Sequence, residues 1–218
     1  MDIYHAEKSG KIVLSYIMET RCADVKHTDR FKLFAMGNNL VTPLTLAESA
    51  RFVGKISYVE LQLCSVLAKK STLIDQEYQQ IFLSSASAAH AWRSQQLFDL
   101  LPVSVGLESR DELIESFNPE FDRLLVHLGE EESAAGLLTA LLRKIYPTLL
   151  LVYEERLQLC CSPADMAAKR VFQRVKADLE EVIYDGNLIL EVSDGATSTE
   201  IVDERIVTLL RQLLPSAR

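Results

Sequence analysis

Apolar side chains recur at alternating spacings of three and four residues through most of the chain, and this period predicts amphipathic helices. The pattern predicts long helices over residues 45–70, 72–101, 133–161 and 162–194. Helix-breaking residues are scarce, because residues 55–101 contain neither Gly nor Pro. The first two helices and the last two are joined by short links, while 102–136 is a longer connection. We therefore expect two antiparallel hairpins packed as a bundle.

Capping residues mark several of the predicted helix ends. Thr45 and Glu48 have the spacing of a capping box, in which each side chain binds the backbone amide of the other. The second helix is expected to begin at 72–75, and Ser162-Pro163-Ala164-Asp165 has the residue types of a helix start. Pro147 lies inside the third helix, where its missing amide removes a hydrogen bond and predicts a kink.

Shorter helices are predicted outside these four. Ser109 and Asn118 each precede a segment that is typical of a short helix within the 102–136 connection. Residues 12–18 fit a helix or a strand by pattern alone, and we interpret them as helix because nothing else in the chain would pair with a strand. The predicted organisation is a single all-α domain, 1–218, with an N-terminal helical extension at 1–44, a four-helix bundle at 45–194 and a C-terminal helix at 199–214.

Composition and charge exclude several classes of protein. The 218 residues are 48% apolar and carry a formal charge of −8, so we expect a folded acidic protein rather than a disordered chain or a nucleic-acid binder. The longest uninterrupted apolar run, 149–153, is far shorter than the roughly 20 residues of a membrane span. No signal peptide is expected at the N-terminus. The four cysteines form no CxxC motif, which favours a reduced, cytoplasmic protein.

Two ionisable residues on the first two long helices are candidates for a site. Glu60 falls in the apolar stripe of the first helix, between Ile56 and Leu63. A buried carboxylate must be paired, hydrogen-bonded or metal-bound, unless the bundle is splayed there and Glu60 reaches solvent or a lysine. His90 lies on the second helix among four alanines, which let helices approach closely or leave room for a site. A hydrogen-bonded histidine in the core or at its boundary is the alternative interpretation.

Acidic side chains on the last two long helices are further candidates. Glu154 and Glu155 follow Pro147 on the third helix, and as neighbours they cannot both face the core. On the fourth helix, Asp178 falls at the edge of the apolar stripe, and Glu181 follows one turn later. An acidic run of this kind is also typical of a solvated helix face.

The architecture resembles the ferritin-like dimetal carboxylate bundle, and the run Ala89-His90-Ala91-Trp92-Arg93 is similar to uncharacterised bacterial ferritin-like proteins over about residues 46–192. That class places one Glu on each of two helices and Glu-x-x-His on each of the other two. The resemblance implies a metal set of Glu60, His90, Glu154 and Glu181. Ser87 stands where the second helix should carry Glu, and Tyr184 replaces the last His. One carboxylate and one histidine of the six ligands are therefore missing.

Three functions remain as hypotheses, and they leave enzymatic activity open. The favoured one is a non-catalytic or accessory ferritin-like scaffold that binds a protein partner or small molecule, without nucleic acid or membrane. The second is an iron- or manganese-dependent oxidoreductase with a non-standard centre at Glu60, His90, Glu154 and Asp178 or Glu181. The third is a metal-free enzyme or binder that uses His90 and Glu60 in a pocket lined by Tyr146, Tyr153 and Trp92. A homodimer is also expected, because an amphipathic terminal helix often packs against another subunit, although the same helix could simply cover the bundle.

Overall fold

Every regular element in the described part of the chain is a helix, as the hydrophobic pattern predicts. The computed structural model describes residues 44–103, 106, 108–131, 133–160, 165–192 and 204–213. These residues belong to a compact unit that spans Thr42–Arg218. The interpretation of 12–18 as helix lies outside them.

Helices α3 (Leu46–Ser71) and α4 (Glu77–Asp99) form the first hairpin. The predicted capping box is present, since the Glu48 amide donates to Thr45 Oγ1 at 3.2 Å and the Thr45 amide donates to Glu48 Oε2 at 2.9 Å. The predicted start of the second helix at residue 72 is wrong, because α4 begins five residues later. Thr72 instead closes α3, and its hydroxyl donates to the Lys69 carbonyl at 2.8 Å.

The third long helix is continuous but irregular. It consists of α7 (Ala134–Ala140), the π-helical turn η1 (Leu141–Ile145) and α8 (Tyr146–Leu159). A kink was predicted at Pro147, and the irregularity nearest to it is this π turn, which ends two residues before the proline. The Lys144 carbonyl beside it accepts a hydrogen bond from the Thr148 hydroxyl at 2.8 Å. The helix therefore crosses the bundle without a break.

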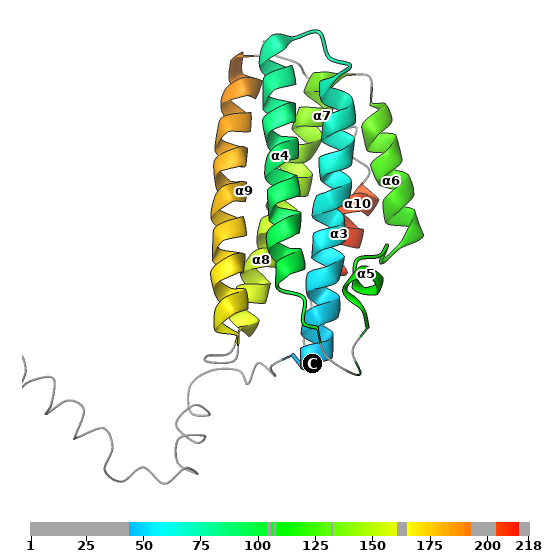
Figure 1. Ribbon diagram of the computed structural model, residues 1–218. Helices are drawn as coiled ribbons and strands as arrows, with labels where there is room; N and C mark the ends of the chain where they lie inside the picture. Colours follow the sequence, from blue (N-terminus) through cyan, green and yellow to red (C-terminus); the bar gives the residue numbers. More distant parts are fainter. Residues whose placement is uncertain are drawn as a thin grey trace, which may run out of the picture. The chain divides into compact units, whose positions relative to one another are not determined.

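Helix α9 (Met166–Val192) packs against α4 and α8, so the long helices lie side by side (Figure 1). The short helices α5 (Arg110–Leu113) and α6 (Pro119–Glu130) begin at the predicted caps, Ser109 and Asn118, and both pack against α3. The predicted fourth-helix cap, 162–164, falls outside the described residues.

The C-terminal helix α10 (Glu204–Arg211) covers the bundle instead of presenting an apolar face. Ile206, Val207, Leu209 and Leu210 are buried, and the helix packs against α8, α6 and η1. Self-association through this helix was the expectation from the sequence. Its apolar side chains pack within the chain, which is the other role that the sequence left open for this helix.

The core runs along the stripes that the sequence predicts. In α3 and in the third long helix, the stripe residues are fully or almost fully buried. The helix Ala134–Leu159 is the one helix among the described residues that is long and apolar enough to cross a membrane by length and composition. Within the bundle, 61% of its most apolar window is buried against the other helices. Burial in the core therefore accounts for its apolar character.

Candidate functional site: a buried ionic cluster

A connected group of ionisable side chains lies at the centre of the bundle. We call it the buried cluster, and its members are Glu60, His90, Arg93, Tyr146, Tyr153 and Asp178. All except Asp178 have completely buried side chains, and the Asp178 side chain is 30% exposed. The cluster joins α3, α4, α8 and α9, so it ties both hairpins together.

Helical spacing brings these residues to one level of the bundle. Glu60 occupies the core-facing stripe of α3, as predicted. His90 and Arg93 are three residues apart on α4 and therefore share one face. Tyr146 and Tyr153 are seven residues apart on α8, which is close to two turns, so both reach the same side.

Glu60 is the hub of the cluster because both of its carboxylate oxygens accept hydrogen bonds. Oε2 accepts from His90 Nδ1 at 2.6 Å and from Arg93 Nε at 2.9 Å. Oε1 accepts from the Tyr153 hydroxyl. Burial opposes ionisation, but the charge of Arg93 and the contacts with His90 and Tyr153 outweigh it and lower the pKa of Glu60 to about 2. Glu60 is therefore a carboxylate at neutral pH.

Arg93 links this carboxylate to a second one. Its Nη1 donates to Oδ2 of Asp178, while Nε donates to Glu60. Burial would lower the pKa of Arg93, but the negative charge of Glu60 raises it above the usual value. Nη2 is buried and has no hydrogen-bond partner. A permanent cation thus occupies the position between carboxylates of α3 and α9.

His90 is held in one protonation form by its two neighbours. A carboxylate only accepts hydrogen bonds, so Nδ1 carries the proton that is shared with Glu60. Nε2 lies 3.0 Å from the Tyr146 hydroxyl and accepts a hydrogen bond from it when the ring is neutral. Burial lowers the pKa of His90 despite the opposing effect of Glu60. Burial also raises the pKa of both Tyr146 and Tyr153, so the two phenols remain protonated donors.

The structure brings together only part of the metal set expected from the resemblance. Glu60 and His90 are in direct contact. Glu154 lies at the surface, where its side chain is 51% exposed and 3.4 Å from Lys176 Nζ. Glu181 is exposed on α9. Among the described residues, no three His, Cys, Asp or Glu side chains are grouped as a metal site would require.

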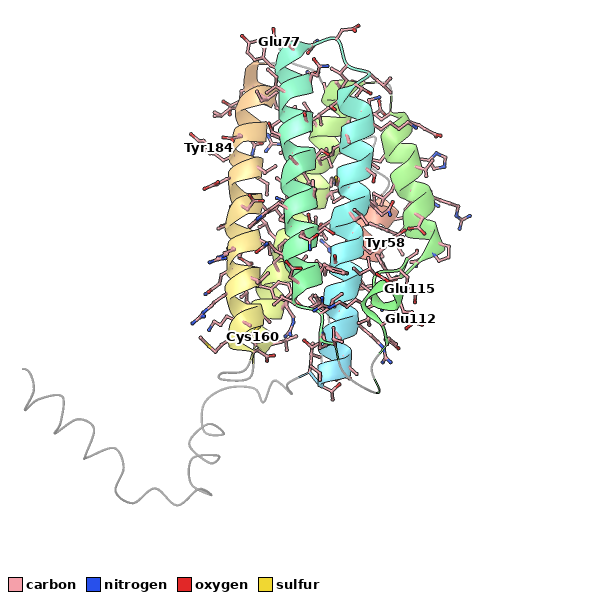
Figure 2. All side chains as sticks on the ribbon, viewed as in Figure 1. Tyr58, Glu77, Glu112, Glu115, Cys160 and Tyr184 are labelled. Atoms are coloured by element: carbon pink, nitrogen blue, oxygen red, sulfur yellow. The ribbon has the colours of Figure 1, made fainter. Side chains whose placement is uncertain are left out.

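Asp178, rather than Glu181, is the α9 carboxylate that reaches the cluster. Tyr184, expected in place of the last histidine, is 66% exposed and points outward from α9 (Figure 2). Arg93 was not predicted as a site residue from the sequence. It lies three residues after His90, so both side chains share one face of the helix. Tyr146 and Tyr153 were expected to line a pocket and instead belong to the buried cluster, while Trp92 is 40% exposed on the opposite side of α4.

A second buried arginine has a different environment. The Arg156 side chain on α8 is 1% exposed, and its guanidinium lies 5.8 Å from the Phe52 ring and 5.7 Å from the Phe172 ring. Nη2 donates to the Ser49 hydroxyl at 2.6 Å, and Nε and Nη1 have no hydrogen-bond partner. Arg156 is therefore held by packing and cation–π contact rather than by the paired carboxylates that hold Arg93.

Comparison of the chain with protein-family models, curated proteins and solved structures finds no significant match.

Proposed function

We propose that the chain is a metal-free helical scaffold with a ferritin-like bundle architecture, which acts by binding a protein partner through its outer surface. One observation carries this proposal. The Arg93 guanidinium lies between Glu60 and Asp178, where a carboxylate bundle would hold a metal ion. It supplies the positive charge that two inward carboxylates from different helices require.

The donor set does not fit a metal ion in this arrangement. Glu60 already accepts three hydrogen bonds, from His90, Arg93 and Tyr153. The His90 nitrogen nearest to it carries a proton and cannot coordinate a cation. Binding a metal would require displacement of Arg93 from a completely buried position and deprotonation of His90. These contacts favour a structural role for the cluster.

The same contacts argue against acid–base catalysis by His90 and Glu60. They form the hydrogen-bonded pair that acid–base chemistry would use, but neither side chain is exposed to solvent. Each polar atom of the pair already has a protein partner. A substrate would reach them only if the long helices separated, so the outer surface of the bundle is the better candidate for contact with other molecules.

Elemental analysis of the purified chain tests this proposal. The protein would be produced in medium supplemented with iron and manganese, beside the His90→Ala and Glu154→Gln variants. We expect no stoichiometric metal in any of the three. Near-stoichiometric metal in the unmodified chain that is lost in His90→Ala and kept in Glu154→Gln would overturn the proposal. That result would favour an oxidoreductase whose centre includes His90 but not Glu154, whereas loss of the metal in Glu154→Gln as well would favour the centre expected from the sequence.

A further inference from the structure

An apolar patch lies on the outer surface where α4 and α9 run side by side (Figure 1). Five large side chains form it, with exposed fractions of 69% for Tyr78, 56% for Ile81, 40% for Trp92, 66% for Tyr184 and 45% for Leu188. We call these five residues the α4–α9 patch. No described helix is drawn over this face of the pair. An exposed apolar face of this kind is typical of a contact surface.

The patch is continuous across the two helices. They are antiparallel, and two contacts set their register: the ion pair of Arg93 with Asp178 and the packing of Phe82 against Gly186. At this register Ile81 is level with Leu188. Both side chains are exposed opposite the buried faces of their helices, and packed helices lie about 10 Å apart. The two residues therefore belong to one apolar surface.

Along α4, small side chains lie between the two ends of the patch. Ser85 and Ala88 are exposed and follow Ile81 at spacings of four and three. Trp92 comes four residues later, so all four residues share one helix face. From Tyr78 to Trp92 the patch is about 21 Å long at 1.5 Å per residue. Bulky side chains of a partner would fit over the small residues, and about four turns of a helix would cover the whole length.

The charge beside the patch is negative. The exposed acidic residues of α4 and α9 along its length are Glu77, Glu180, Glu181, Asp185 and Glu191. Glu180 is paired with Lys176, but among the described residues the other four have no hydrogen-bond or ion-pair partner. From 177 to 191, α9 contains no Lys or Arg, while α4 contains no Lys and a single Arg, which is buried. Four carboxylates are therefore left without a counterion within the described part of the chain.

This negative charge is concentrated towards one end of the patch. Arg174 is exposed on α9 and is level with Gln95, about one turn beyond Trp92, so a cation is present at that end. At the opposite end, Glu191 is level with Tyr78. A cationic partner would therefore bind with its basic residues towards Tyr78.

We infer that the α4–α9 patch binds a basic amphipathic helix of a partner protein. The apolar side of such a helix would pack on the patch, and its Lys and Arg side chains would pair with the carboxylates beside it. Nucleic acid and an anionic lipid surface would be repelled by these carboxylates. A second copy of the chain, packed patch to patch, would set Glu181 and Asp185 against the same acids. The described elements are all helices, so they offer no strand edge to an extended peptide.

This inference rests on the proposed scaffold function and names the class of its partner. The probe is a fluorescein-labelled synthetic peptide of leucine and lysine, about 18 residues long, whose leucines lie on one helix face. Titration with the full chain, followed by fluorescence anisotropy, should show saturable binding. Trp92 is the only tryptophan, and its emission should shift to shorter wavelength as unlabelled peptide covers it. A shuffled peptide of the same composition, which forms no apolar face, should bind at least about tenfold more weakly.

Variants of the apolar side chains test whether the peptide binds at the patch. The double variant Ile81→Gln and Leu188→Gln should raise the Kd at least about tenfold, because it removes the apolar contact from both helices. Val126→Gln is the matched control, since Val126 is 59% exposed on α6, away from the patch. Its Kd should equal that of the unmodified chain.

Variants of the acidic side chains test the choice of a basic partner. Glu181→Gln with Asp185→Asn should weaken binding and reduce its dependence on salt concentration. Glu115→Gln with Glu155→Gln removes the same amount of charge elsewhere on the surface. Glu115 lies across the molecule from Tyr184, which points outward from α9 (Figure 2). This control should bind the peptide as the unmodified chain does.

Absence of saturable binding would overturn the inference, as would an unchanged Kd in the Ile81→Gln and Leu188→Gln variant. Dimerisation in sedimentation velocity that this variant abolishes would overturn it and assign the patch to a second copy. Binding to phosphatidylglycerol vesicles that the same variant abolishes would assign it to a membrane instead. Far-UV circular dichroism of each variant separates lost binding from lost folding. Because metal content and peptide binding are independent readouts, failure of this inference is distinguishable from failure of the scaffold proposal.

Discussion

Arg93 Nε lies 2.9 Å from Oε2 of Glu60, and both side chains are completely buried. The two residues come from α4 and α3, and Arg93 continues to Asp178 on α9. One side chain therefore connects three helices by charge-assisted hydrogen bonds. The arrangement makes the cation part of the core rather than a ligand brought from solution.

Arg93→Met should destabilise the chain by about 3–5 kcal/mol, the cost of removing one partner of a buried ion pair. Glu60 would keep its buried charge without the cation that stabilises it. Urea denaturation followed by circular dichroism measures the change. A loss below about 1 kcal/mol would show that the cluster contributes little to folding.

Arg156→Met is the natural contrast, because this buried arginine has no carboxylate among its described hydrogen-bond partners. Methionine fills a similar volume and removes two unpartnered N–H groups. We expect a change within about 1 kcal/mol of the unmodified chain, in either direction. If the same denaturation experiment gave a loss as large as for Arg93→Met, packing rather than charge pairing would govern both sites.

The cluster predicts that stability falls in acid, beginning near neutrality. Both His90 and Glu60 have lowered pKa values in the folded chain, so the unfolded chain binds more protons as the pH falls. The contribution of His90 is complete above pH 6.5 and declines below it. That of Glu60 is complete above about pH 4.5 and is lost towards pH 2, amounting to about 3 kcal/mol.

Urea midpoints measured from pH 4 to pH 8 test this dependence. His90→Gln keeps a hydrogen-bond donor for Glu60 but does not titrate in this range. Its midpoint should change less between pH 7 and pH 5 than that of the unmodified chain. Equal slopes for the two proteins would show that His90 does not control the first loss of stability.

Gly54→Ala should destabilise the chain by several kcal/mol, because the added Cβ would overlap the Leu113 carbonyl of α5. A backbone atom cannot move aside without shifting α5 from α3. Gly129→Ala is the control in α6, where the nearest atom, Val66 Cγ1, lies 3.6 Å from the new Cβ. That variant should gain about 0.5–1 kcal/mol from helix propensity. Thermal unfolding of both proteins gives the comparison, and similar melting temperatures would contradict the close packing at Gly54.

The sequence predicted correctly the features that depend on a single helix, such as the buried stripe of α3 and several helix caps. The stripe of α3 predicted the burial of Glu60, and the caps at Thr45, Ser109 and Asn118 are all present. The start of the second helix was predicted wrongly at Thr72, because a threonine hydroxyl can cap the end of one helix as readily as the beginning of another. That choice depends on the tertiary position of the next helix.

The candidate site was harder to predict because it combines four helices. Spacing identified the face of Asp178 but could not rank it against Glu181, which lies three residues further on the same helix. The interior of α4 was the larger difficulty. Polar and apolar residues occur together on its buried side, so hydrophobic periodicity carries almost no information about its orientation. Only the partners on other helices reveal why Arg93 is buried.

The π turn at Leu141–Ile145 inserts one extra residue into the helix that carries the two cluster tyrosines. Without it, every side chain from Tyr146 onward would be rotated by about 100° around the helix axis. Deletion of a single residue from the turn would therefore direct both phenols away from Glu60 and His90. Homologous bundles with an unbroken α-helix at this point would align with this chain only through a one-residue gap.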